Sequence, residues 1–120
     1  MNFLLVFIGG GLGSCLRYAI SIFVKSKPDS FPWATFSANL ISCFLIGLLI
    51  GQLSKGELSE NQKLLLMTGF CGGFSTFSTF GAEVLQLAKG GSLSIAICYV
   101  VASVILGSLL VFIGSVFTQS

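Results

Sequence analysis

Histidine is absent from this 120-residue sequence, and charged residues make up only 8% of it. The first absence removes the commonest general base and metal ligand of proteins. The second excludes a water-soluble globule, because a soluble domain has about 25% charged residues. The net charge of +2 is also too small to indicate a nucleic-acid partner. The sequence is instead 54% hydrophobic, which predicts an integral membrane protein surrounded by lipid.

No C-x-x-C pair occurs among the four cysteines, which are Cys15, Cys43, Cys71 and Cys98. The spacing therefore gives no support to a zinc site or a thiol redox motif. Each cysteine lies in an apolar segment, where it is expected to pack as a small hydrophobic residue. The sequence also shows no nucleophile paired with a base, so we expect the protein not to be an enzyme.

Four apolar runs are each long enough for a hydrocarbon core about 30 Å thick. They predict an all-α integral membrane protein with four transmembrane helices, over about 3–24, 33–53, 64–88 and 93–117. Short polar connections join them, so we expect one domain over 1–120 that crosses the cell (inner) membrane several times. Ser59 and Gln62 have the spacing of a capping box that opens the third helix.

Lysines are divided almost equally between the two sides of such an arrangement. One side would carry two and the other three, namely Lys55 and Lys63 against Lys25, Lys27 and Lys89. The positive-inside rule needs a clear excess to fix an orientation. Either a subtler feature such as Arg17 sets the topology, or the chain inserts both ways and pairs with an inverted copy of itself. A homodimer would also provide a symmetry axis on which a central site could lie.

Small residues at four-residue spacing recur in three of the runs, as Gly9 and Gly13, Gly47 and Gly51, and Ser103 and Gly107. Small-x-x-x-small pairs let membrane helices approach closely. We expect these residues to serve helix packing.

The centre of the third run, Gly69–Phe80, differs from an ordinary spanning helix. Gly72 and Gly73 are followed by hydroxyl residues that alternate with phenylalanines. Paired glycines loosen a helix because they have no Cβ. At membrane depth, broken backbone is tolerated only where protein or a water-filled cavity satisfies it. We therefore predict that the third helix breaks near Gly72–Ser75 and that this stretch is the functional centre.

Phe77 and Phe80 are the most unusual residues of this stretch, because Ser75, Thr76, Ser78 and Thr79 surround them. Phenylalanine on a lipid-facing surface would be unremarkable. A phenyl ring, however, has a positive edge, and edges directed into a narrow path could hold a small anion. Hydroxyl and amide groups would then replace the rest of its hydration shell.

Five further polar residues lie within the apolar runs, and each has two readings. Asn39 either forms an interhelical hydrogen bond or lines an ion path as a hydrogen-bond donor. Arg17 either snorkels in a structural role or marks the mouth of an aqueous vestibule that favours anions. Glu83 is either a structural acid or a transport group. Tyr99 and Ser103 share a helix face, where they either extend a polar track or pack.

Taken together, these stretches resemble the fluoride channels of the Fluc (CrcB) family. The matching pieces are Gly9-Gly10…Gly13…Arg17-Tyr18, Thr35…Asn39…Gly47, and Gly69–Phe80 with Glu83. The resemblance covers the whole chain, and its third piece is the most specific. It implies an antiparallel, dual-topology homodimer with two fluoride pores, each lined by both subunits. It further implies passive, fluoride-selective export that protects the cell against fluoride toxicity.

The resemblance also implies a role for individual residues. The fluoride pore would be lined by Asn39, Phe77, Phe80, Ser78, Thr79, Tyr99 and Ser103, with Arg17 in the vestibule. The backbone carbonyls of Gly72 and Ser75 from each subunit would hold a structural Na⁺ at the dimer centre. Two positions depart from the family pattern: Ser75 stands where Thr is common, and Gly107 where Ser often continues the polar track.

Two other classes of membrane protein fit part of the sequence. Proton-coupled exporters of the small multidrug-resistance type share the size, the four spans and the dual topology. They have a Glu in the first helix, whereas this first run has Arg17 and no acid, and Glu83 is the only candidate. A non-transporting membrane scaffold would not explain the clustered hydroxyl groups.

Overall fold

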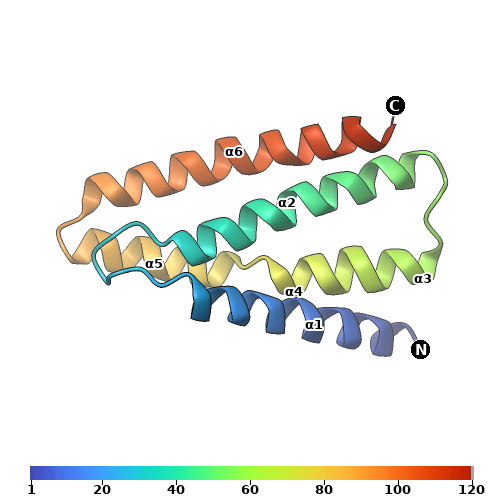
Figure 1. Ribbon diagram of the computed structural model, residues 1–120, viewed down its shortest axis with the longest axis horizontal. Coiled ribbons are helices and arrows are strands. Elements are labelled where there is room, and N and C mark those ends of the chain that lie inside the picture. The colour runs from blue at the N-terminus through green and yellow to red at the C-terminus, as the bar shows by residue number, and fades with distance from the viewer. Residues whose placement is uncertain (120) are drawn as a thin grey trace.

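The computed structural model describes residues 1–119, which form helices joined by short connections (Figure 1). The first span is α1 (Asn2–Phe23), the second is α2 (Trp33–Ser54) and the last is α6 (Leu93–Gln119). The third covers Glu60–Lys89, and all four are long and apolar enough to cross a membrane. The predicted all-α class and four spans are therefore confirmed, with ends that differ by a few residues.

The third span is assembled from several pieces. It consists of α3 (Glu60–Gln62), the π-helix η1 (Lys63–Cys71), α4 (Gly72–Phe74) and α5 (Phe77–Lys89). The predicted capping box is confirmed, because the Gln62 N–H donates to Ser59 Oγ and the Ser59 N–H donates to Gln62 Oε1. These bonds satisfy backbone donors that a helix start leaves free.

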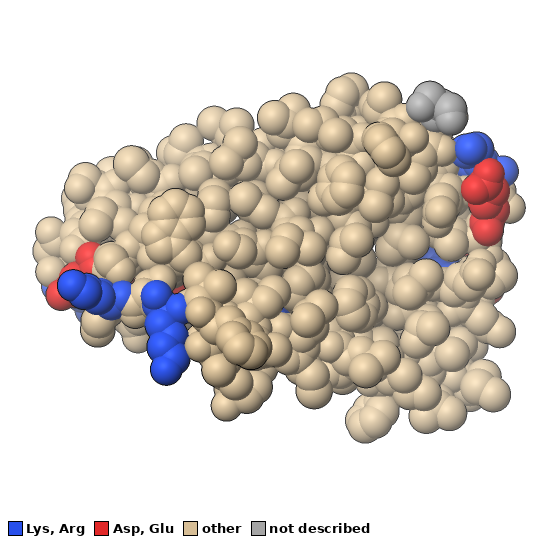
Figure 2. Space-filling view, in the orientation of Figure 1, with Lys and Arg blue, Asp and Glu red and all other residues tan. Residues whose placement is uncertain are grey.

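The four spans run roughly along the long axis of the molecule, with α6 beside α2 and α1 beside η1 and α4 (Figure 1). Both termini lie at the end where α2 turns into α3, and the other two connections lie at the opposite end. Most of the visible Lys, Arg, Asp and Glu atoms lie toward these two ends in the space-filling view (Figure 2). This distribution suits a multi-pass membrane protein, because charged side chains are costly at the bilayer centre.

Glycine allows the closest helix contacts. A Cβ on Gly13 would collide with Phe70 O of η1, and a Cβ on Gly47 would collide with Val111 O of α6. Small residues at such crossings bring backbones together and give close van der Waals packing in lipid. The packing role predicted for these glycines is confirmed.

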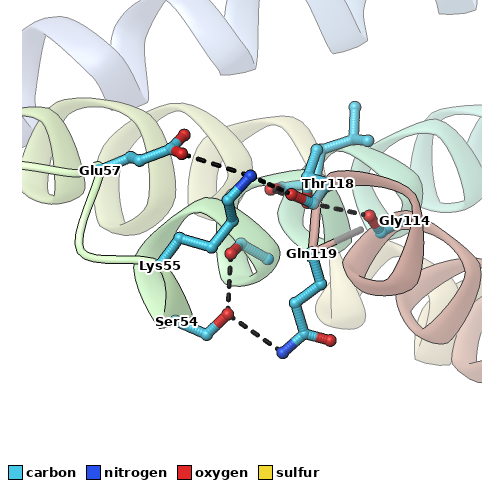
Figure 3. Close-up of polar contacts among 8 residues, drawn as sticks. Ser54, Lys55, Glu57, Gly114, Thr118 and Gln119 are labelled. Carbon is cyan, nitrogen blue, oxygen red and sulfur yellow. Dashed lines mark hydrogen bonds and ion pairs between the residues drawn. The ribbon is translucent and has the colours of Figure 1, made fainter.

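Polar contacts close the α2–α6 pair near the C-terminus (Figure 3). Lys55 Nζ donates to Thr118 O at 3.1 Å and lies 3.3 Å from Glu57 Oε1. Gln119 Nε2 donates to Ser54 Oγ at 3.1 Å. Exposed contacts of this kind contribute only about 0–1 kcal/mol each. The close glycine contacts deeper between α2 and α6 therefore contribute more to the packing of these two helices.

An aromatic cluster fixes α5 against α2 and α6 at the opposite end. Tyr99 is fully buried, and its ring centroid lies 4.8 Å from that of Phe80 and 5.3 Å from that of Phe31. Phe36 and Leu87 complete the core of this cluster. The cluster therefore holds the first turn of α5, which carries Phe77 and Phe80, in a defined place.

Candidate functional site at the break in the third span

The third span is interrupted at Ser75 and Thr76. Ser75 has φ −81° and ψ 159°, and Thr76 has φ −151° and ψ 122°, so both are extended. The break thus begins at the last residue of the predicted stretch and ends one residue later. The glycine pair is not its cause: Gly72 is helical, with φ −64° and ψ −36°. A Cβ on Gly73 would instead collide with Gly10 O, which makes close approach to α1 the reason for glycine there.

Asn39 of α2 holds the break by both ends of its carboxamide. The Thr76 N–H donates to Asn39 Oδ1 at 2.8 Å, and Asn39 Nδ2 donates to Thr76 O at 3.2 Å. A primary amide has two N–H hydrogens, so one remains for another acceptor.

Two backbone N–H groups at the break are diverted from their helical partners. In a continuous α-helix, N–H(i) donates to C=O(i−4), so Thr76 would bind Gly72 O and Thr79 would bind Ser75 O. The Thr76 N–H donates to Asn39 instead, and the Thr79 N–H donates to Thr76 Oγ1 at 3.2 Å. The carbonyls of Gly72 and Ser75 have therefore lost the donors that a continuous helix would give them.

The neighbouring carbonyls of Cys71 and Gly73 accept hydrogen bonds from side chains. Cys71 O accepts from Ser42 Oγ at 3.2 Å and from Ser75 Oγ at 2.8 Å. Gly73 O accepts from Arg17 Nε at 3.2 Å and from Ser14 Oγ at 3.4 Å. Sequence reasoning missed Ser14 and Ser42, although each lies three residues before or after a predicted site residue and so shares its helix face.

A cavity of about 290 Å³ lies beside the break. It is lined by Asn39, Cys43, Ser75, Thr76, Phe77, Phe80, Ser103 and Val104. The ring centroids of Phe77 and Phe80 are 5.8 Å apart, and Phe77 is 82% exposed in the single chain. Among residues 1–119, no group forms a hydrogen bond with the buried Ser103 Oγ. Four of the predicted pore residues, on three different spans, thus meet at one cavity.

A second cavity, of about 280 Å³, contains Arg17. Thr79 also lines it, together with Tyr18, Ser21, Ala34, Thr35 and Glu83. The Arg17 guanidinium is anchored through Nε, which leaves its other N–H groups free to face this space. Ser78, also predicted to line the pore, lines neither cavity and is exposed.

Glu83 and Tyr99 form a hydrogen-bonded group apart from the first cavity. Tyr99 OH donates to Glu83 Oε1 at 2.9 Å, and Thr35 Oγ1 donates to Glu83 Oε2 at 2.9 Å. Tyr99 thus binds an acid inside the protein and does not line the cavity that Ser103 lines.

A family model described as CrcB-like protein, Camphor Resistance (CrcB), matches residues 4–115 of this chain. The chain belongs to this family. The fluoride-specific ion channel FluC of Phocaeicola vulgatus is 43% identical over 114 residues, 94% of each chain. The FluC of Thermus thermophilus is 43% identical over 114 residues, which is 94% of this chain and 90% of the relative. FluC 1 of Streptomyces avermitilis is 41% identical and covers 100% of this chain and 98% of its own.

The match to the CrcB family spans both cavities and the break, since residues 4–115 include every residue named at them. Cys43 lines the first cavity, a position that its spacing alone did not indicate. A Cβ on Gly107 would lie 3.2 Å from Cys43 Sγ, so Gly107 faces this thiol.

Proposed function

We propose that this chain is the subunit of a fluoride-selective ion channel. The channel gives passive fluoride export across the cell membrane and so protects against fluoride toxicity. The similar proteins named as fluoride-specific ion channels support this function. The observation that carries it is the first cavity, where two phenyl rings, a carboxamide and an unpartnered buried hydroxyl converge beside the break. Conduction requires no covalent chemistry.

The chemistry of the cavity suits a small, strongly hydrated anion. Phenyl edges carry partial positive charge, the remaining N–H of Asn39 is a donor, and so is the Ser103 hydroxyl. A buried hydroxyl without a partner costs about 1–3 kcal/mol, and an anion that accepts from it would remove this penalty. Neutral donors attract the anion without trapping it as a full positive charge would, and conduction needs binding weak enough to release.

Arg17 serves the approach to the pore. Its charge lies at the second cavity, anchored to Gly73 O. A fixed positive charge in a low-dielectric recess raises the local concentration of anions. Thr79 lines the same cavity and offers its hydroxyl there.

The working unit is an antiparallel homodimer of dual topology. Phe77 lines the cavity yet is 82% exposed in one chain, so a second copy is needed to enclose the ion path. The near-equal division of lysines gives neither orientation an advantage. An inverted copy would place two breaks around a two-fold axis.

A structural Na⁺ at the dimer centre would be held by the carbonyls of Gly72 and Ser75 from both subunits. The helical donors of both carbonyls are diverted to other acceptors. Carbonyl oxygen is the ligand type that a hard cation prefers, and the residues present therefore fit such an ion. When bound, the cation would neutralise the carbonyl dipoles and join the two breaks.

The decisive experiment is efflux from proteoliposomes that contain the purified full-length chain. We expect fluoride efflux that carries current, with no chloride efflux and no need for a proton gradient. A proton-coupled exporter would instead retain fluoride and exchange a hydrophobic cation for protons, and that outcome would overturn the channel.

Glu83 is the acid that such an exporter would need. Both of its carboxylate oxygens accept hydrogen bonds, which gives this acid a structural use.

A further inference from the structure

Asn39 is bound to the break more closely than a residue that only lines a cavity needs to be. Its carboxamide pairs with both the N–H and the C=O of Thr76, at 2.8 and 3.2 Å. An extended residue presents these two groups on the same edge, so the side chain binds Thr76 as a neighbouring β-strand would. At membrane depth neither group has water as an alternative partner, and the pairing thus stabilises the extended conformation.

The same pairing decides which carbonyl is free. By accepting the Thr76 N–H, Asn39 Oδ1 prevents the i→i−4 bond that would occupy Gly72 O. If Asn39 could not accept, Thr76 would be free to return to helical geometry and bind Gly72 O. The carbonyl would then no longer be available to a cation.

The pairing also fixes the direction of the donor that faces the cavity. One N–H hydrogen of Asn39 is engaged by Thr76 O, and the carboxamide is planar. The second hydrogen is therefore held in one orientation relative to Phe77 and Phe80, which line the same cavity. No other common side chain of this size has both an acceptor and two N–H donors.

We propose that Asn39 is a positioning residue that couples the cation carbonyls of the break to the anion cavity. The proposal rests on the channel function and the Na⁺ site proposed above. Through one carboxamide, Asn39 keeps Gly72 O free for the cation and aims its remaining N–H at the anion path. Loss of Asn39 should therefore weaken cation binding as well as fluoride flux, whereas loss of a residue that only lines the cavity should weaken flux alone.

The test compares Asn39→Leu, which has similar size and no polar group, with Ser103→Ala, which removes only the cavity hydroxyl. Two quantities are measured on the full chain: fluoride efflux against Na⁺ concentration, and hydrogen exchange of the Thr76 amide in detergent with and without Na⁺. For Asn39→Leu we expect the half-saturating Na⁺ concentration to rise by about tenfold or more, the scale of a typical coupling between sites. Exchange of the Thr76 amide should differ from that of the wild type. Ser103→Ala should lower efflux but keep the wild-type half-saturating Na⁺ concentration and wild-type exchange of the Thr76 amide.

Thr76→Val provides a second variant, should Asn39→Leu fold poorly. It keeps the backbone pairing with Asn39, so Thr76 stays extended, and it removes only the Oγ1 that accepts the Thr79 N–H. We expect the wild-type half-saturating Na⁺ concentration and wild-type exchange at the Thr76 amide, and a shift in either would contradict the role assigned to the Asn39 pairing.

The outcomes separate this proposal from those on which it rests. Wild-type Na⁺ dependence and wild-type exchange in Asn39→Leu, with reduced flux, would overturn the coupling and leave Asn39 as a cavity residue only. If fluoride flux through the wild-type chain depended on neither the identity nor the concentration of the cation, the Na⁺ site would be overturned, and the proposed coupling would fall with it. A wild-type chain that does not conduct fluoride would overturn the channel, while exchange against Na⁺ concentration would still test the break.

Discussion

At the residue scale, neighbours on one helix face have different uses. Tyr99 and Ser103 share a face of α6, and their spacing predicts one polar track. Ser103 lines the first cavity, but the Tyr99 hydroxyl binds Glu83 because Phe31 and Phe80 enclose its ring. The spacing predicts the shared face correctly. It cannot predict the bulk that other helices place over one of the two residues.

Phe77 allows the role of the ring edge to be tested. Phe77→Ile keeps an apolar side chain at an exposed position and removes the positive ring edge. We expect fluoride efflux to fall by about tenfold or more, which corresponds to about 1.4 kcal/mol. Each chain should remain folded, because the single chain leaves this side chain 82% exposed. Efflux from proteoliposomes and elution on size-exclusion chromatography measure the two effects.

Phe112→Ile is the matched control. Phe112 is 65% exposed on α6 and does not line the first cavity. The same substitution should leave efflux unchanged there. Equal efflux from wild type and Phe77→Ile would contradict an anion held by ring edges.

At the element scale, the sequence predicts where the third span breaks better than why it breaks. Hydroxyl residues and paired glycines indicate the region, and the break begins at Ser75. Both glycines stay helical, and Gly73 makes the close contact with α1. The extended conformation of Thr76 depends on Asn39, which lies 37 residues away in the chain. Such a long-range partner is not visible in local pattern.

Gly47 allows the packing of α2 against α6 to be tested. Gly47→Ala places a methyl group against Val111 O, and overpacking of this kind costs about 1–3 kcal/mol. We expect a lower free energy of unfolding in detergent, measured by titration with a denaturant. Gly81→Ala is the control, because nothing in the chain lies within 4 Å of its added Cβ. That variant should gain about 0.5–1 kcal/mol from helix propensity, and equal losses in both variants would exclude the close contact as the cause.

At the scale of the whole molecule, the single chain is an incomplete pore. Its first cavity has an exposed phenyl ring on its wall, and its break leaves the carbonyls of Gly72 and Ser75 without their helical donors. Lipid tails can cover the ring, but they offer neither a hydrogen-bond donor nor a cation to those carbonyl oxygens. The proposed inverted copy would meet both needs with one interface, because it would cover the ring and bring a second pair of carbonyls to the shared Na⁺.

Dual topology can be tested by biasing the charge of each side. One variant replaces Lys25, Lys27 and Lys89 by Gln, and the other replaces Lys55 and Lys63 by Gln. Each should then insert in a single orientation, because lysine-rich loops stay on the cytoplasmic side. We expect neither variant alone to give fluoride efflux from cells, since no inverted partner is present. Co-expression should restore efflux, which also shows that the substitutions leave both chains folded. Full efflux from either variant alone would rule out the inverted dimer.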